Sequence, residues 1–253
     1  MCLNGEAAER KITERTKAII PVHFAGLACK IEDIETLMVK YDIPIIYDAA
    51  HAVGGRRNNL PVGKWGQACC YSFGSEQNMT TLGEGGALLT NDADFAERVR
   101  RGKFNCRMTK VQAAVGLSQL AKIDRINAER RERFLRLAEL LADVEEVNVQ
   151  EGIDNQHACN LFVVQLQLEK LKCDRDEFRE LLQDEYQVGT GLHYPAVWSR
   201  EAARQFEYDN SDCPHTERIC SSVISLPVSP RTSEEELQYV AWSMKQLIAE
   251  QRK

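Results

Sequence analysis

Short apolar runs alternate with amphipathic stretches in the N-terminal part of the chain, which is the pattern of strands joined by helical crossovers. Between the runs at 18–22 and 44–47, apolar residues recur at the three- and four-residue spacing of one helix face. These residues are Ile31, Ile34, Leu37, Met38 and Tyr41. The pattern predicts a strand, a helix and a second strand that ends at Asp48, which together form a βαβ unit.

Further along, the runs at 68–73 and 86–90 predict two more strands. Asp92 is suited to cap a following helix that ends near Arg101, because a carboxylate can accept hydrogen bonds from first-turn N–H groups. The stretch 109–142 is rich in Ala, Leu, Glu and Arg and contains no proline. It predicts one long helix.

The rest of the chain repeats the alternation, with strands predicted at 161–166 and 223–226 and helices at 175–186 and from Ser233 onward. We therefore expect an α/β fold with two domains. Residues 1–108 would form a domain with a mainly parallel sheet, and residues 109–253 would form the long linking helix and a smaller α/β domain.

Composition narrows the classes of function. The chain has 253 residues, of which 43% are hydrophobic and 28% charged, as in ordinary globular proteins. Its 32 basic and 38 acidic residues give a net charge of −6, and no Lys/Arg-rich block is present, so we expect no nucleic-acid partner. No apolar run of about 18 residues and no signal-peptide pattern occur, so we expect a cytoplasmic protein without a membrane span.

Nine cysteines are scattered along the chain or adjacent, with no C-x-x-C pair, which favours reduced thiols. Cys213, His215 and Cys220 are close in sequence. They offer only three ligands at irregular spacing, so we expect no metal site.

Six segments, in a fixed order, carry a resemblance to a known family. They are 21–26 (PVHFAG), 44–55 (PIIYDAAHAVGG), 62–73 (VGKWGQACCYSF), 82–92 (LGEGGALLTND), 107–120 (RMTKVQAAVGLSQL) and 188–195 (VGTGLHYP). Together they resemble the DegT/StrS family of sugar-nucleotide aminotransferases. The resemblance implies an aspartate-aminotransferase-like fold, pyridoxal-phosphate (PLP) fold type I, with the cofactor domain first. It also implies amino transfer, usually from glutamate, to a keto sugar on a nucleotide.

Three residues match cofactor-binding positions of that family. By resemblance, Asp48 pairs with the protonated pyridine nitrogen, which keeps the ring cationic and able to act as an electron sink. His51 matches a residue beside the phenolic oxygen of the ring, and Ser72 matches a serine that binds the phosphate. Each also has a purely structural interpretation. Asp48 could be a polar residue at a strand end, His51 a histidine in a turn, and Ser72 a hydroxyl that bonds its own backbone.

Gln77 occupies the position, five residues after Ser72, where the family has its Schiff-base lysine. An amide nitrogen is not nucleophilic, because its lone pair is delocalised into the carbonyl group. It has no pKa near neutrality that would let it act as a base. The sequence therefore predicts impaired catalysis, with non-covalent cofactor binding at best. Lys64 and Lys103 are the nearest lysines that could substitute, and no motif supports either.

Other positions follow from the same resemblance. Asn105 matches an asparagine that reaches the cofactor phosphate of a neighbouring subunit, which implies a dimer with shared sites. His193 and Tyr194 match a segment on the sugar side of the pocket, although a structural His-Tyr pair ahead of a proline is an equally good interpretation.

The first residues resemble the family just before its PVH strand, so we expect a large domain truncated at its N-terminus, without the turn that holds the phosphate. The leading hypothesis is a degenerate sugar-nucleotide aminotransferase, a pseudoenzyme of the polysaccharide-biosynthesis type. A non-catalytic partner or regulatory subunit of a full-length paralogue is the alternative, and a gene fragment without function is the third. We expect a homodimer, or a heterodimer with a full-length relative. The sugar, the nucleotide and the amino donor are left open.

Overall fold

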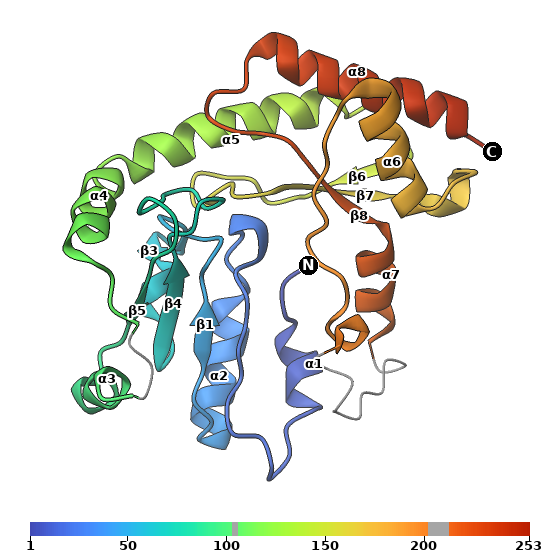
Figure 1. Cartoon of the computed structure of the whole chain (residues 1–253). Coiled ribbons are helices and arrows are strands. Elements are labelled where there is room, and N and C mark those ends of the chain that lie inside the picture. The colour runs from blue at the N-terminus through green and yellow to red at the C-terminus, as the bar shows by residue number, and fades with distance from the viewer. Residues whose placement is uncertain (103–105, 202–212) are drawn as a thin grey trace. The chain divides into compact units, whose positions relative to one another are not determined.

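The structure is a computed structural model that describes residues 1–102, 106–201 and 213–253. The chain divides into two compact units (Figure 1). Residues 2–131 and 152–160 form the N-terminal unit, and residues 132–151 and 161–253 form most of the C-terminal unit.

A three-stranded sheet organises the N-terminal unit. Its strands are β1 (Ile46–Asp48), β4 (Ala68–Ser72) and β5 (Gly86–Leu89), in the order β1-β4-β5. β1 and β4 are parallel, whereas β5 pairs with β4 in the antiparallel direction. The strand predicted at 18–22 is reduced to two isolated parallel bridges, from Ile19 to Ile45 and from Val22 to Asp48.

The apolar face predicted for the first helix is confirmed at three of its five positions. Helix α2 (Ile31–Tyr41) buries Ile31, Ile34 and Leu37, whereas Met38 is half-buried and Tyr41 is 38% exposed. Ile31 and Ile34 pack in the core of the unit with buried residues of the neighbouring strands, among them Tyr47 and Cys69. The smaller elements of this unit are α1 (Gly5–Glu9), β2 (Arg56–Arg57) and β3 (Leu60–Pro61), and the last two form an antiparallel hairpin.

Helix α3 (Ala93–Arg100) begins as predicted, because the Asp92 carboxylate accepts a hydrogen bond of 2.8 Å from the Phe95 N–H. The prediction of one helix over 109–142 is wrong. α4 (Lys110–Leu120) and α5 (Ile123–Leu140) are separated by a turn.

The helix breaks at this turn because of tertiary packing, since neither proline nor glycine lies there. The Lys122 N–H donates to the Gln119 carbonyl three residues back, at 2.9 Å, which tightens the chain. Ile123 is then buried against Val53 and Met79. Packing of this side chain therefore outweighs the helix propensity of the surrounding sequence.

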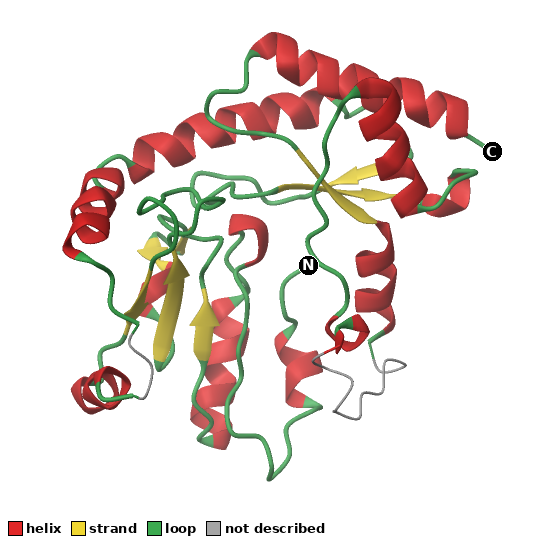
Figure 2. Ribbon diagram, viewed as in Figure 1, coloured by secondary structure: helices red, strands yellow, loops and turns green. Residues whose placement is uncertain are grey.

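The C-terminal unit contains an antiparallel sheet of order β6-β7-β8 (Figure 2). Its strands are β6 (Val147–Val149), β7 (Phe162–Leu166) and β8 (Val223–Leu226). Its helices, besides the end of α5, are α6 (Arg175–Tyr186), α7 (Pro214–Ser222) and α8 (Glu234–Gln251). β7, β8, α6 and α8 agree with the prediction, and β6 and α7 were not predicted.

Strand β7 lies at the centre of this sheet, and four of its five residues are buried. Its first residue, Phe162, packs edge-on against Phe134 with ring centroids 5.2 Å apart. Helix α8 begins at a capping box made by Ser233 and Glu236, as the sequence predicts from Ser233. The fold is thus mixed α/β. In the ranges that the structure describes, no helix is both long enough and apolar enough to span a bilayer.

Candidate functional site

Asp48 is the last residue of β1, as predicted, and lies at the carboxyl end of a parallel strand pair. Its N–H donates to the Pro21 carbonyl and its carbonyl accepts from the His23 N–H, both at 2.9 Å. The carboxylate Oδ1 accepts a hydrogen bond of 2.9 Å from the Ala50 N–H. Open α/β sheets place their ligands at this end of the strands.

The negative charge of Asp48 influences its neighbours on β4. Burial raises the pKa of the Cys70 thiol, and the Asp48 carboxylate adds to this rise. The thiol of Cys70 is therefore kept in its neutral form.

His51 is buried, with 6% of its surface exposed, and its ring is held from one side by the backbone. Nδ1 accepts a hydrogen bond of 3.2 Å from the Ala25 N–H. The ring of Phe24 packs edge-on against it, with centroids 5.9 Å apart. Because Nδ1 is an acceptor, the neutral ring carries its proton on Nε2.

Ser72 is the last residue of β4, and Asp48 is the last residue of the adjacent parallel strand. The two residues therefore share one edge of the sheet. The hydroxyl oxygen of Ser72 accepts a hydrogen bond of 3.4 Å from the Gly74 N–H. This local bond is long and leaves the hydroxyl proton available to a ligand.

Gln77 follows in the loop after β4, where its N–H donates to the Gly74 carbonyl at 3.1 Å. Its side-chain oxygen Oε1 accepts a hydrogen bond of 3.2 Å from the Asn160 side chain. Position 77 therefore presents a neutral carboxamide. Of the two lysines considered as substitutes, Lys64 lies in the short 3₁₀ helix 62–64 and Lys103 lies outside the described residues.

Sequence reasoning missed the asparagines around Gln77. Asn78, Asn127 and Asn160 are 7%, 3% and 6% exposed, and their side chains are joined by hydrogen bonds. A buried polar group needs such partners, because desolvation without them costs free energy. No local pattern marks these residues in the sequence, since their partners lie far along the chain.

A second buried polar cluster lies beside Asp48. The His23 ring is fully buried and stacks on Tyr47, with centroids 5.0 Å apart and an interplanar angle of 11°. Burial lowers the pKa of His23 to about 4. The Tyr47 hydroxyl donates to the Glu35 carboxylate at 2.8 Å, and burial, followed by this bond, raises the pKa of Tyr47. Both rings are therefore neutral near pH 7.

His193 and Tyr194 belong to the C-terminal unit, so they are described by their local contacts. His193 Nδ1 lies 2.9 Å from the hydroxyl oxygen of Ser225 on β8. The two rings pack edge-on at 5.0 Å, and Tyr194 is 42% exposed. Asn105 lies outside the described residues.

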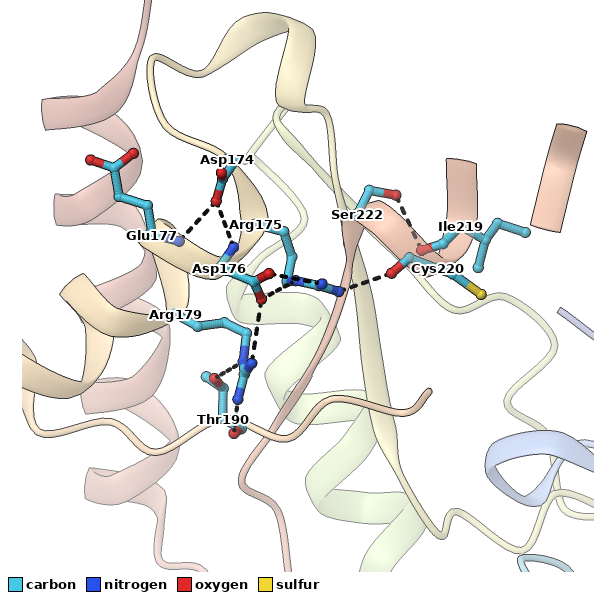
Figure 3. Close-up of polar contacts among 9 residues, drawn as sticks. All are labelled: Asp174, Arg175, Asp176, Glu177, Arg179, Thr190, Ile219, Cys220 and Ser222. Atoms are coloured by element: carbon cyan, nitrogen blue, oxygen red, sulfur yellow. Dashed lines mark hydrogen bonds and ion pairs between the residues drawn. The ribbon is translucent and has the colours of Figure 1, made fainter. Parts of the chain in front are cut away.

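Arginines of α6 hold the segment that leads to His193 (Figure 3). Arg179 donates to the hydroxyl and carbonyl oxygens of Thr190, at 3.0 and 3.2 Å. Arg175 donates at 2.9 Å to the Cys220 carbonyl in the last turn of α7. Helix α6 thereby fixes both this segment and α7 within the C-terminal unit.

Four of the candidate residues thus lie in one unit, at the ends of the adjacent strands β1 and β4 or in the loops that follow them: Asp48, His51, Ser72 and Gln77. The site offers a carboxylate, an imidazole, a hydroxyl and a carboxamide. Across the described ranges 1–102, 106–201 and 213–253, no three His, Cys, Asp or Glu side chains gather as metal ligands would.

Comparison with known proteins adds to this geometry. Residues 1–245 match the model of the DegT/DnrJ/EryC1/StrS aminotransferase family. An uncharacterized protein of Methanocaldococcus jannaschii is 30% identical over 284 residues, which cover 99% of this chain and 72% of that protein.

Solved structures agree. DesI, determined in the presence of its TDP-sugar product, is 26% identical with a TM-score of 0.89, over 98% of this chain and 66% of DesI. DesV of S. venezuelae, determined in complex with a ketimine intermediate, is 27% identical with a TM-score of 0.86, over 98% of this chain and 69% of DesV. The mixed α/β fold is therefore the fold of these aminotransferases.

Proposed function

The chain belongs to the DegT/DnrJ/EryC1/StrS aminotransferase family, and on that premise we propose that it is a sugar-nucleotide aminotransferase by descent that binds PLP without a covalent link and does not turn over by itself. The proposal depends on which groups of the family's site this chain provides and which it lacks.

The polar groups at the sheet edge fit non-covalent binding of the cofactor. Asp48 would pair with the pyridine nitrogen, because it is the anion at the carboxyl end of β1. His51 would contact the phenolic oxygen and Ser72 the phosphate, and Asn105 would reach the phosphate bound by a second subunit. When bound, PLP supplies an electron sink.

The carboxamide of Gln77 is the observation that carries the proposal. A covalent link to PLP requires an amine, and the amide nitrogen of Gln77 does not supply one, because its lone pair is delocalised. The same group has no usable pKa for moving a proton. The residue at this position therefore does not fit covalent attachment, and it provides no group for either task of a lysine, attachment of the cofactor or transfer of a proton.

For the substrate we propose a nucleotide-linked keto sugar. The support comes from DesI, whose structure was determined in the presence of a TDP-sugar product, and which is 26% identical to this chain. His193 and Tyr194 would line the sugar side. Tyr194 is 42% exposed and can offer its ring to a sugar face.

A second candidate function, a non-catalytic partner subunit, is favoured by the surface of the N-terminal unit. β5 is an edge strand of its sheet, and it exposes 37% of Leu88 and 46% of Leu89. On α4, Val111, Leu117 and Leu120 are 50% exposed or more. An unpaired strand edge with apolar side chains favours association with another chain, here a second copy or a full-length relative.

Addition of PLP to the purified chain tests the proposal. We expect a reversible change of the PLP absorbance that is lost on dialysis, and no protein-bound label after borohydride reduction and mass spectrometry. Label on a single lysine would contradict the absence of a covalent link. No change of absorbance, together with a stable complex with a full-length relative on size-exclusion chromatography, would favour the partner subunit.

A further inference from the structure

The carboxamide of Gln77 is the last member of a row of four amide side chains, which we name the amide relay: Asn127, Asn78, Asn160 and Gln77. An amide group offers an oxygen that accepts and a nitrogen that donates, so its orientation decides what it can bind. In the relay, backbone carbonyl groups fix the orientation of the first amides, and each later amide is oriented by the one before it.

Two backbone carbonyl groups fix the start of the relay. The Asn127 side-chain nitrogen donates to the Val53 carbonyl at 2.9 Å, so its oxygen faces Asn78 and accepts a bond of 2.9 Å from the Asn78 nitrogen. The same Asn78 nitrogen donates to the Ala158 carbonyl. A carbonyl oxygen can only accept. Turning Asn127 round would therefore bring its oxygen against the Val53 carbonyl oxygen and its nitrogen against the Asn78 nitrogen, and turning Asn78 round would bring its oxygen against two acceptors.

The fixed orientation passes on to Gln77. The oxygen of Asn78 accepts a bond of 3.0 Å from the Asn160 side-chain nitrogen, and that nitrogen also donates to the Gln77 oxygen at 3.2 Å. The oxygen of Gln77 is therefore engaged. Its nitrogen Nε2 lies on the side of the amide away from that bond, and it has no acceptor among the residues that the structure describes.

The relay is held rigidly because it is buried. Its three asparagines are at most 7% exposed, so reversing any one of them would leave desolvated polar groups without partners. Arg130 fixes the backbone on the Asn160 side, since its guanidinium donates to the carbonyl oxygens of Cys159 and Asn160 at 3.3 and 3.2 Å.

From this geometry we infer that Asn160 is a positioning residue that turns Gln77 into a hydrogen-bond donor, and that Gln77 Nε2 holds the aldehyde oxygen of PLP in place of a covalent bond. The inference rests on the proposed function. It deepens that proposal by assigning position 77 a binding role.

The chemistry of the two groups is compatible with this role. The aldehyde oxygen is an acceptor, and the amide N–H is a donor that does not condense with it. Gln77→Glu tests the donor nitrogen of the side chain separately from its acceptor oxygen. A glutamate still accepts from Asn160 but offers no donor to a ligand, and Gln77→Met removes both ends at similar length.

Equilibrium titration of the full chain with PLP tests the binding role. We expect Gln77→Glu and Gln77→Met to weaken PLP binding about tenfold, the effect of losing roughly one hydrogen bond. The matched control is Gln119→Glu, which makes the same substitution on α4 and should leave the affinity within about twofold of the original. Unchanged affinity in Gln77→Glu would overturn the inference while leaving the proposed function intact.

Urea unfolding tests the relay without any ligand. The shift of the unfolding midpoint in the double variant Gln77→Met, Asn160→Ala should be smaller than the sum of the shifts in the two single variants, because each substitution removes the same hydrogen bond. Additive shifts would overturn the positioning role of Asn160. If the unaltered chain shows no affinity for PLP, the proposed function and the binding role both fail, whereas non-additive shifts would still establish the relay.

Discussion

The side-chain nitrogen of Asn78 donates a buried hydrogen bond of 2.9 Å to the side-chain oxygen of Asn127. The two residues are 49 positions apart, in the loop after β4 and in α5. Their bond ties the loop that carries Gln77 to a helix of the same unit. The geometry of position 77 therefore depends on a residue that makes no contact with it.

Asn127→Ala is expected to destabilise the chain by about 3 kcal/mol, because it leaves the Val53 carbonyl and the Asn78 amide buried without this partner. Asn91→Ala makes the same change at an exposed residue and should cost less than about 0.5 kcal/mol. Urea unfolding of both variants measures the difference. Equal stabilities would mean that the buried bond contributes nothing.

Two buried histidines predict a loss of stability in weak acid. Burial lowers the pKa values of His23 and His157 to about 4 each. The unfolded chain binds a proton at each histidine near pH 6.5, and the folded chain does not until about pH 4. Stability is therefore complete above pH 6.5 and falls by about 3 kcal/mol per histidine as the pH drops towards 4.

His157→Asn provides the variant for this prediction. The asparagine oxygen can replace Nδ1 as the acceptor of the Cys159 N–H, which donates at 2.8 Å. Between pH 7 and pH 4, the unfolding free energy of the variant should fall by about 3 kcal/mol less than that of the unaltered chain. An unchanged slope in His157→Asn would contradict the prediction.

The features that the sequence predicts well are those recorded in local patterns. Ile31, Ile34 and Leu37 are buried on one face of α2 because their spacing matches the helix period. Asp48 and Ser72 end their strands because each follows an apolar run. The pattern of apolar and polar residues is therefore enough to place each of them at the end of a strand, whereas the parallel pairing that makes the two strands neighbours is seen only in the structure.

The features that the sequence does not predict depend on contacts between distant segments. The turn between α4 and α5 comes from the burial of Ile123, and no breaking residue marks it. Asn160 reaches Asn78 across 82 residues, so its part in the site depends on how 152–160 returns to the N-terminal unit. β6 has only three residues and gives too little pattern to detect.

Gly66 lies where a side chain would collide with the core. Its φ is +71°, and a Cβ atom would lie 2.7 Å from the Ile45 carbonyl oxygen and 2.9 Å from the Tyr47 ring. Gly66→Ala should therefore cost about 3 kcal/mol or more, from backbone strain and displacement of a buried ring. Differential scanning calorimetry or urea unfolding measures this cost.

Gly152→Ala is the matched control for Gly66. Its φ is +81°, but the nearest atom to an added Cβ is a Leu27 methyl group at 3.7 Å. It should cost only about 1 kcal/mol, the penalty for the left-handed conformation. If both variants lose the same stability, the close approach of the added Cβ to the Tyr47 ring does not contribute to the cost.

Gln77→Lys is expected not to restore transamination. A protonated lysine has no acceptor for the Asn160 nitrogen, which now donates to Gln77 at 3.2 Å. A neutral lysine could accept that bond only with the lone pair that it needs for attack on an aldehyde. We therefore expect no turnover with glutamate, and a loss of stability of about 1 kcal/mol that Gln77→Met shares. Borohydride labelling and the change of PLP absorbance with glutamate measure the outcome, and turnover in this variant would show that the relay does not restrain position 77.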